Sequence, residues 1–244
     1  MEGPSIHRIA DRLHIFAGQT IEHAAGNAHQ PKELLQGARI ASVRAVKKRL
    51  FMETGVATAV IHFLMYGSYR VNKQRDLDER LSLYCSRDDL HFYSCSVKIL
   101  HSGSEELAGY DDPEGDVLSD QFDYKRALQA MHTDDRIIAD VLLDQDIFGG
   151  IGNILKNEVL FTTQVHPASP ASAIDREKAT AIIDAAVELA GAWYRDKRAD
   201  RQREWTIYRQ AICPTCGAQV TRKKMGSFDR ITFFCRDCQH RYSG

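Results

Sequence analysis

The sequence predicts an α+β protein with a leading helix, an all-β segment, a helical segment and a metal-held β-hairpin near the C-terminus. Three observations carry this prediction. Strand-like runs fill residues 20–100, helical periodicity replaces them after residue 120, and two Cys-x-x-Cys pairs follow near the end. The 244 residues, 43% hydrophobic and 27% charged, are enough for more than one ordered core.

The chain opens MEGPSIHRIADRL, which predicts a helix. Pro4 stands where the first turn of a helix tolerates proline, and Gly18 ends the pattern. Between them, apolar residues recur at helical spacing: Ile6, Ile9, Ala10, Leu13 and Phe16. One face of this helix is therefore expected to be buried, with Met1 and Glu2 held against the core rather than fraying.

Residues 20–100 alternate between apolar runs and polar turns. The runs are ARIASVRAV, RLFMETG, TAVIHFLMYGSYRV and RLSLYCSRDDLHFYSCSVKIL. Several strands at such short spacing indicate a β-sandwich or a barrel. The stretch HSGSEELAGYDDPEGD reads as a loop and marks a boundary near residues 105–120.

Helical patterns follow this boundary. They are YKRALQAMH, RIIADVLLDQ, NILKNEVLFTTQ and a long helix from about Ser172 to Tyr194. We therefore expect three domains: an N-terminal β domain over 1–110, a helical domain over 120–205, and a metal-binding finger over 206–244.

The C-terminal cysteines have the spacing of a zinc site. Cys213 and Cys216 are separated by eighteen residues from Cys235 and Cys238, and the intervening AQVTRKKMGSFDRITFFC alternates around a Gly-Ser turn like a β-hairpin. Disulfides are the alternative, but they are improbable in the reducing environment of the cytosol. We predict one structural Zn²⁺ with all four positions filled, and no such role for the isolated Cys85 and Cys95.

The net charge of −1 hides an asymmetry. Residues 195–244 carry 12 Lys and Arg against 5 Asp and Glu, and residues 1–194 carry 20 against 28. A basic end fits a nucleic-acid contact, and a solvated basic surface is the alternative. No apolar run approaches the roughly 20 residues of a membrane span, and the start lacks the pattern of a signal peptide, so we expect a cytoplasmic protein without membrane contact.

The stretch DQDIFGGIGNILKNE lies between two predicted helices. Gly150 and Gly152 permit close backbone approach, and Asn153 begins a helix whose free N–H groups can receive a phosphate. A plain connector between helices is the alternative.

Taken together, the Glu-Gly-Pro start, the GGIGN turn and the four-cysteine hairpin with DRITFFCRDCQ resemble the formamidopyrimidine-DNA glycosylase and endonuclease VIII family. The resemblance covers nearly the whole chain. It implies a β-sandwich, a helix-two-turns-helix domain and a zinc finger that enclose damaged double-stranded DNA with the damaged base rotated out. It also implies an N-terminal amine that attacks the sugar, releases the base and breaks the strand by elimination.

The opening residues depart from the family pattern. The family usually begins Met-Pro-Glu and exposes a proline amine, whereas this chain reads Met-Glu. Alignment on Glu2-Gly3-Pro4 makes Met1 the expected nucleophile, as a primary amine, and Glu2 the proton donor for opening of the sugar ring. A protein that binds damage without lyase activity is the alternative. Ser5 stands where the family usually has a second Glu.

Further site residues follow from the resemblance. Lys48 in KRLF matches the second catalytic element, a lysine placed in a strand. Leu64, Met65 and Tyr66 align with the wedge residues of the endonuclease VIII branch, which fill the space left by the extruded nucleotide. The expected phosphate ligands are Arg70, Asn153 and Arg230.

The resulting prediction is a monomeric DNA glycosylase with abasic-site lyase activity, cytoplasmic and associated with the nucleoid through DNA. LMYG and the short link from Trp193 to Cys213 favour endonuclease VIII and hence oxidised pyrimidines as substrates. The alternatives are a damage-recognition module without catalysis and a zinc-ribbon transcription factor.

Overall fold

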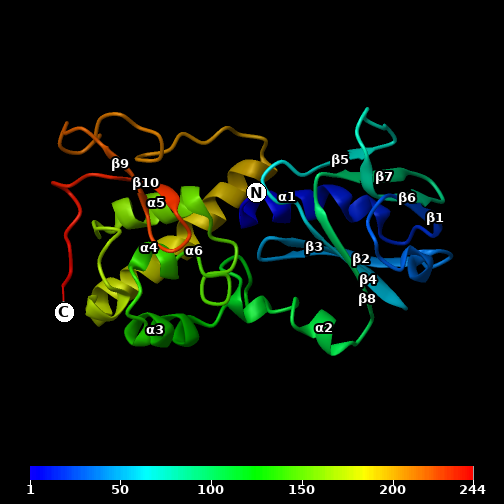
Figure 1. Ribbon diagram of the computed structural model, residues 1–244, viewed down its shortest axis with the longest axis horizontal. Coiled ribbons are helices and arrows are strands. Elements are labelled where there is room, and N and C mark those ends of the chain that lie inside the picture. Colours follow the sequence, from blue (N-terminus) through cyan, green and yellow to red (C-terminus); the bar gives the residue numbers. More distant parts are fainter. Residues whose placement is uncertain (244) are drawn as a thin grey trace. The chain divides into compact units, whose positions relative to one another are not determined.

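The computed structural model describes residues 1–243, which divide into two compact units. The first comprises Met1 and residues 5–112, and the second comprises residues 2–4 and 113–244. Figure 1 shows the elements of each unit along the chain. The division between Asp112 and Pro113 falls within the loop-like stretch predicted as a boundary. The predicted separation of 206–244 as a third domain stays a prediction.

The first unit is a β-sandwich of two antiparallel four-stranded sheets. One sheet has the order β1 (Ile21–Ala25), β6 (Glu79–Cys85), β7 (Asp89–Tyr93), β5 (Ser68–Val71). The other has the order β2 (Ile40–Val46), β3 (Arg49–Thr54), β4 (Ala57–His62), β8 (Ser96–His101). Side chains from both sheets form one apolar core. Of the two predicted alternatives, the structure is therefore a sandwich and not a barrel.

Helix α1 (Gly3–Leu13) opens the chain and continues into a 3₁₀ turn, His14–Phe16. The residues at helical spacing, Ile6, Ile9, Leu13 and Phe16, are buried in the same core as the sheets. The predicted helix and its buried face are confirmed.

Two predicted strands of the sandwich differ in detail. The run 58–71 is split, because β4 ends at His62 and β5 begins only at Ser68. Lys47 and Lys48 form the turn between β2 and β3 rather than part of a strand, with Lys47 at φ +57°. A one-turn helix, α2 (Glu105–Ala108), interrupts the predicted loop.

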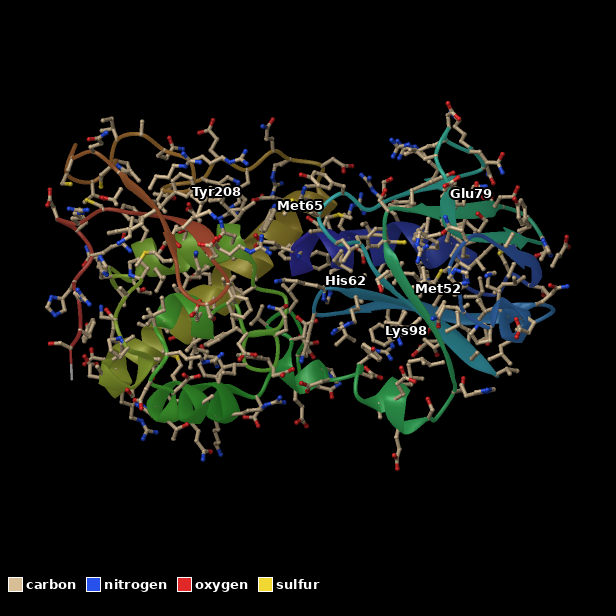
Figure 2. The ribbon with its side chains drawn as sticks, viewed as in Figure 1. Met52, His62, Met65, Glu79, Lys98 and Tyr208 are labelled. Atoms are coloured by element: carbon tan, nitrogen blue, oxygen red, sulfur yellow. The ribbon has the colours of Figure 1, made fainter. Side chains whose placement is uncertain are left out.

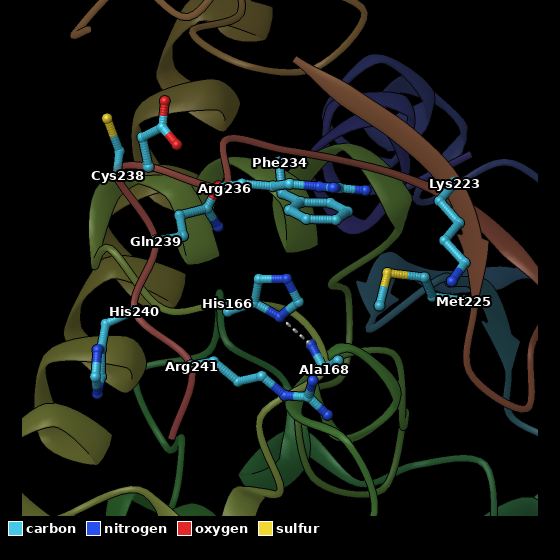
Figure 3. A pocket seen from close by; sticks show the side chains of 11 residues that line it. His166, Ala168, Lys223, Met225, Phe234, Arg236, Cys238, Gln239, His240 and Arg241 are labelled. Atoms are coloured by element: carbon cyan, nitrogen blue, oxygen red, sulfur yellow. Dashed lines mark hydrogen bonds between the residues drawn. The ribbon is translucent and has the colours of Figure 1, made fainter. Parts of the chain in front are cut away.

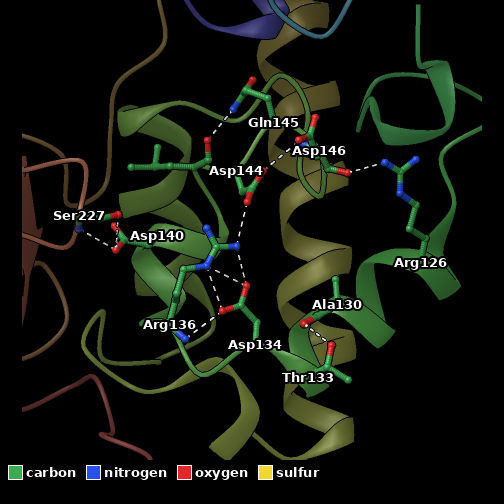
Figure 4. A network of polar contacts seen from close by, with 11 residues as sticks. Arg126, Ala130, Thr133, Asp134, Arg136, Asp140, Asp144, Gln145, Asp146 and Ser227 are labelled. Atoms are coloured by element: carbon green, nitrogen blue, oxygen red, sulfur yellow. Dashed lines mark hydrogen bonds and ion pairs between the residues drawn. The ribbon is translucent and has the colours of Figure 1, made fainter. Parts of the chain in front are cut away.

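Helices dominate the second unit: α3 (Tyr124–Thr133), α4 (Ile138–Val141), α5 (Asn153–Thr162) and α6 (Arg176–Arg198). The predicted helix at RIIADVLLDQ is a single turn. Arg136 binds the carboxylates of Asp134 and Asp144 at 2.6 and 2.8 Å and so ties together the loops on both sides of that turn (Figure 4). The long helix begins later than predicted, because the Asp175 carboxylate caps it by accepting from the Lys178 N–H.

The hairpin of the second unit forms as predicted. Strands β9 (Thr221–Met225) and β10 (Arg230–Phe234) pair antiparallel around residues 226–229. A small separate core lies beneath them, formed by Phe161, Ile207, Cys213, Val220, Phe233 and Cys235. Among residues 1–243, no helix is both long and apolar enough to cross a bilayer.

Candidate nucleic-acid site

The amino group of the chain is held in the first unit. The α-amino nitrogen of Met1 donates a hydrogen bond of 2.7 Å to the backbone carbonyl oxygen of Leu64. The Met1 residue is 36% exposed. The predicted fixed N-terminus is confirmed, and its partner is the loop between β4 and β5.

That loop, residues 63–67, presents three apolar side chains to solvent. Leu64 is 49% exposed, Met65 63% and Tyr66 81%, whereas the preceding Phe63 is fully buried. Figure 2 labels Met65 on this loop. Large apolar side chains exposed side by side are costly in water and mark a binding surface.

The loop is closed by a tight turn that requires glycine. The Gly67 N–H donates to the Phe63 carbonyl oxygen at 2.7 Å, and a Cβ on Gly67 would lie 2.0 Å from that oxygen. Leu64 adopts the left-handed conformation, with φ +52°. The backbone therefore fixes the three exposed side chains on a constrained loop.

Basic groups surround the end of β4 in the same unit. Burial lowers the pKa of His62, and the positive charges of Arg49, the N-terminal amine and Lys48 lower it further. His62 (Figure 2) is thus kept neutral within a cationic group that includes the amine and Lys48. Sequence reasoning missed His62, although its place directly before the loop was a usable signal.

The two consecutive lysines have different environments. Lys47 is 4% exposed, and its ammonium binds the Asp112 carboxylate at 2.8 Å. Lys48, the predicted site residue, is half-buried and sits in the β2–β3 turn. The turn thus sends the Lys47 ammonium to a structural ion pair, while the charge of Lys48, like that of the N-terminal amine, acts on His62.

Glu2 lies at the N-terminus of α5 in the second unit. Its carboxylate accepts from the N–H groups of Ile154 at 2.7 Å, Gly152 at 3.2 Å and Leu155 at 3.3 Å. The prediction that free N–H groups here would receive a phosphate is therefore wrong, because Glu2 already fills this anion-binding position. Three N–H donors and the helix dipole stabilise the negative charge of the carboxylate.

Gly152 of the GGIGN turn makes room for this contact. A Cβ on Gly152 would lie 2.4 Å from Cγ and Cδ of Glu2. Gly3 donates its N–H to the Gly150 carbonyl oxygen at 2.9 Å. The turn thus receives the side chain of Glu2 and the backbone of Gly3. It therefore has a structural role beyond connecting two helices.

The predicted phosphate ligands occupy different places. Arg70 is exposed on β5, where its guanidinium donates to the Tyr69 carbonyl oxygen. In the second unit, Asn153 is the first residue of α5, and its Nδ2 donates to the Ile231 carbonyl oxygen of β10 at 2.9 Å. The neighbouring Arg230 is exposed at the start of β10. Asn153 and Arg230 are therefore held together, and Arg70 belongs to the other unit.

Glu158, also on α5, has a structural role. It is 3% exposed, and its carboxylate accepts from the backbone N–H groups of Thr206, Ile207 and Tyr208 at 2.8–2.9 Å. It fastens the segment leading to the hairpin onto the helix.

The four C-terminal cysteines fit a metal ion. Their sulfur atoms lie within 4.8 Å of one another, with Cys213–Cys238 at 3.8 Å and Cys216–Cys235 at 3.4 Å. A tetrahedral zinc ion with Zn–S bonds of about 2.3 Å separates its sulfur ligands by about 3.8 Å. Cys85 and Cys95 are buried, and burial raises the pKa of each to about 12.

A basic hollow of about 670 Å³ lies elsewhere in the second unit (Figure 3). Lys223, Arg236 and Arg241 border it together with His166. Of the predicted site residues, only Cys238 lines it. The hollow is thus separate from Asn153 and Arg230.

Comparison with known proteins supports the expected family. Residues 113–197 match the formamidopyrimidine-DNA glycosylase H2TH domain. Endonuclease 8-like 2 of Bos taurus is 34% identical over 199 residues, which cover 75% of this chain and 58% of that protein. Endonuclease 8-like 3 of Xenopus laevis is 28% identical over 236 residues, covering 90% of this chain and 38% of that protein. The chain thus spans less than two thirds of the length of either relative.

Solved structures match over the whole fold. The formamidopyrimidine-DNA glycosylase of Lactococcus lactis, bound to DNA containing an abasic site, superposes with a TM-score of 0.87 at 20% identity, covering 99% of this chain and 100% of that one. The same protein with DNA containing an oxidised pyrimidine gives a TM-score of 0.84. These matches establish the fold.

Proposed function

This chain belongs to the formamidopyrimidine-DNA glycosylase and endonuclease VIII family, in its endonuclease VIII-like branch, and we propose that it excises damaged bases from DNA and cleaves the strand at the resulting abasic site. One observation carries the proposal. The Met1 amine is bound 2.7 Å from the Leu64 carbonyl of the exposed apolar loop. The proposed nucleophile, the Met1 amine, is thus bonded to the loop whose apolar side chains would fill the space left by the extruded nucleotide.

The α-amine of Met1 is the proposed nucleophile. An α-amine has an unperturbed pKa of about 8, against about 10.4 for a lysine, so more of it is neutral at pH 7. Its nitrogen attacks C1′ of the sugar as the bond to the base breaks, and the departing base takes a proton from water. Loss of the nitrogen's proton and opening of the ring give a Schiff base. Removal of a C2′ proton then expels the 3′ phosphate.

Glu2 is the proposed acid–base group. It follows Met1 in the chain, and three backbone N–H groups at the N-terminus of α5 donate to its carboxylate. A negative carboxylate stabilises a protonated Schiff base and can take up a proton and return it when the sugar ring opens. The rigid anchorage fixes where that exchange takes place.

Lys48 and the exposed residues bind the DNA in this proposal. The Lys48 ammonium, whose charge acts on His62 as that of the amine does, binds a phosphate or assists at the sugar. Met65 and Tyr66, with Leu64 at the base of the loop, replace the stacking lost when the nucleotide is rotated out. Arg70, Asn153 and Arg230 are the proposed phosphate ligands.

One structural Zn²⁺ is proposed for the four cysteines. With all four tetrahedral positions taken by thiolates, the metal has no open position for a substrate, so its part is to fold the hairpin that carries Arg230.

The proposed substrate follows from the endonuclease VIII-like branch of the family. We propose double-stranded DNA with oxidised pyrimidines as substrate, because LMYG and the short link from Trp193 to Cys213 resemble the endonuclease VIII branch. Relatives named endonuclease 8-like 2 and 3 match the chain. A monomer in the cytoplasm, associated with the nucleoid, completes the proposal.

Strand cleavage assays test the function. A duplex with one thymine glycol and a duplex with one abasic site should both be cut, and an undamaged duplex should not. Lys48→Ala should lose base removal, while Lys73→Ala, a change of an exposed lysine in the same unit, should retain it. Binding to damaged duplex without cleavage of either substrate would contradict an enzyme and leave a damage-recognition protein.

A further inference from the structure

Lys156 is a fully buried lysine that the proposed chemistry does not use. It lies on α5 and is 1% exposed. Burial of a charged side chain is costly, so an ammonium at such a place needs hydrogen-bond acceptors and opposite charge.

The ammonium of Lys156 binds both the helix and the hairpin. Its Nζ donates to Asn153 Oδ1 at 2.9 Å and to Thr232 Oγ1 at 2.7 Å. An ammonium only donates, so it sets the orientation of the Asn153 amide, with oxygen toward Lys156. The amide nitrogen then donates to the Ile231 carbonyl, and its second hydrogen has no acceptor within residues 1–243.

The same ammonium is connected to the backbone of Arg230. The hydroxyl of Thr232, which accepts from Lys156, donates to the Arg230 carbonyl oxygen at 3.2 Å. Asn157 adds a further tie, because its Oδ1 accepts from the Phe233 N–H at 2.9 Å. One edge of β10 is thus fixed to α5 by buried polar side chains.

The charges around Lys156 come from three other elements. Burial lowers its pKa to about 8, the negative charges of Asp140 and Glu2 oppose that shift, and the positive charge of Arg230 adds to it. Asp140, on α4, accepts from the N–H and hydroxyl of Ser227 in the hairpin turn (Figure 4), and its Oδ1 is buried without a hydrogen-bond partner in the described residues. Lys156 therefore sits among charged groups of the N-terminal residues, α4 and β10, and one of these groups, Asp140, binds the hairpin turn.

We propose that Lys156 is the positioning residue of the phosphate site: it orients the Asn153 amide and the Arg230 backbone, and a bound DNA phosphate in turn keeps its ammonium protonated. The inference rests on the proposed function, since it assumes that Asn153 and Arg230 bind DNA phosphate.

Proton linkage follows from this arrangement. Above about pH 8 the ammonium of the free protein loses its proton, and a phosphate bound nearby raises its pKa again. DNA binding at such pH should therefore take up a proton, and affinity should fall as pH rises through the free protein's pKa.

Calorimetry of DNA binding tests the proposal. The probe is a duplex with one tetrahydrofuran residue, which has no base and cannot form a Schiff base, titrated at about pH 8.5 in two buffers of different ionisation enthalpy. The wild type should take up a fraction of a proton. Lys156→Met should take up less and bind about tenfold more weakly. The matched control, Lys125→Met at an exposed position of α3, should behave as the wild type.

An unperturbed α-amine also titrates in this range, so the difference in proton uptake between wild type and Lys156→Met is the quantity that decides. Equal proton uptake and equal affinity in the two would overturn the proposal. If Lys156→Met does not fold, an NMR titration of the wild-type lysine ¹⁵Nζ signals replaces it. One signal should titrate near pH 8 and shift upward with the tetrahydrofuran duplex, and the absence of that shift would overturn the proposal.

These outcomes are distinct from failure of the proposed function. A wild type that does not bind the tetrahydrofuran duplex would contradict DNA repair itself. A wild type that binds it, with no contribution from Lys156, would contradict only the positioning role.

Discussion

The carboxylate of Glu2 accepts a 2.7 Å hydrogen bond from the backbone N–H of Ile154, the second residue of α5. This contact joins the opening residues of the chain to the glycine-rich turn, two features that the sequence separates by 150 residues. The helix N-terminus serves as the anchor for a carboxylate rather than for a DNA phosphate. Gly152 is therefore required by Glu2, and in the proposed function phosphate is bound by side chains.

Replacement of Glu2 by Gln should remove catalysis while leaving the fold. The amide keeps an oxygen for the α5 N–H groups but cannot exchange a proton, so base excision should fall at least about 100-fold. Loss of the charge at the helix N-terminus should cost about 1 kcal/mol in the free energy of unfolding. Single-turnover excision and thermal unfolding measure the two effects.

The matched control is Glu105→Gln, which removes an exposed carboxylate in the first turn of α2. It should keep full activity. Unchanged excision by Glu2→Gln would show that Glu2 is only a helix cap.

Gly152→Ala should displace the Glu2 side chain. The new Cβ would lie 2.4 Å from Cγ and Cδ of Glu2, so the carboxylate must leave its three N–H donors. We expect about 1–3 kcal/mol of destabilisation and an excision rate close to that of Glu2→Gln. Gly55→Ala is the control, because nothing lies within 4 Å of a Cβ there. Normal activity in Gly152→Ala would mean that the anchorage of Glu2 is dispensable.

Tyr66→Ala should weaken binding to damaged DNA without affecting stability. Tyr66 is 81% exposed and contributes little to the core, but as a wedge it would stack against bases. Loss of such stacking should cost about 1–3 kcal/mol of binding free energy for a tetrahydrofuran duplex. Val56→Ala, which trims another exposed apolar residue of the same unit, should bind normally. Equal affinity in both variants would exclude Tyr66 from the interface.

Metal removal should unfold the hairpin and leave the sandwich intact. The hairpin core is small, so the four thiolates need their ion to stay together. Elemental analysis should find one zinc per chain. After chelation, DNA binding should be lost while the buried Cys85 and Cys95 remain unreactive toward alkylating reagents at neutral pH, because burial raises the pKa of each. DNA binding that survives complete removal of the metal would refute this role.

Sequence reasoning found the elements whose signal is local. The helical spacing of Ile6, Ile9 and Leu13 and the alternation in the hairpin each report a buried face, and both elements formed. Cysteine spacing predicted the cluster because two tight turns suffice to bring the thiolates together. Boundaries were less accurate where side-chain contacts decide them, as at Asp175, which delays the start of α6.

The long-range contacts of the site could not be read from the sequence. Nothing local in Lys156 distinguishes a buried ammonium from an exposed one, since its partner Thr232 lies 76 residues away. The position of His62 directly before the loop is visible in the sequence, but the charges of Lys48 and Arg49 that act on it are not. The contact of Met1 with Leu64 likewise depends on how the β4–β5 loop closes through Gly67.

The central claim, that the Met1 amine forms the Schiff base, is tested most directly by borohydride trapping on an abasic duplex, followed by mass spectrometry of the cross-linked peptide. Reduction should leave the DNA sugar attached to the α-nitrogen of a chain that begins with Met1. The absence of an adduct, or an adduct on Lys48 instead, would contradict the account.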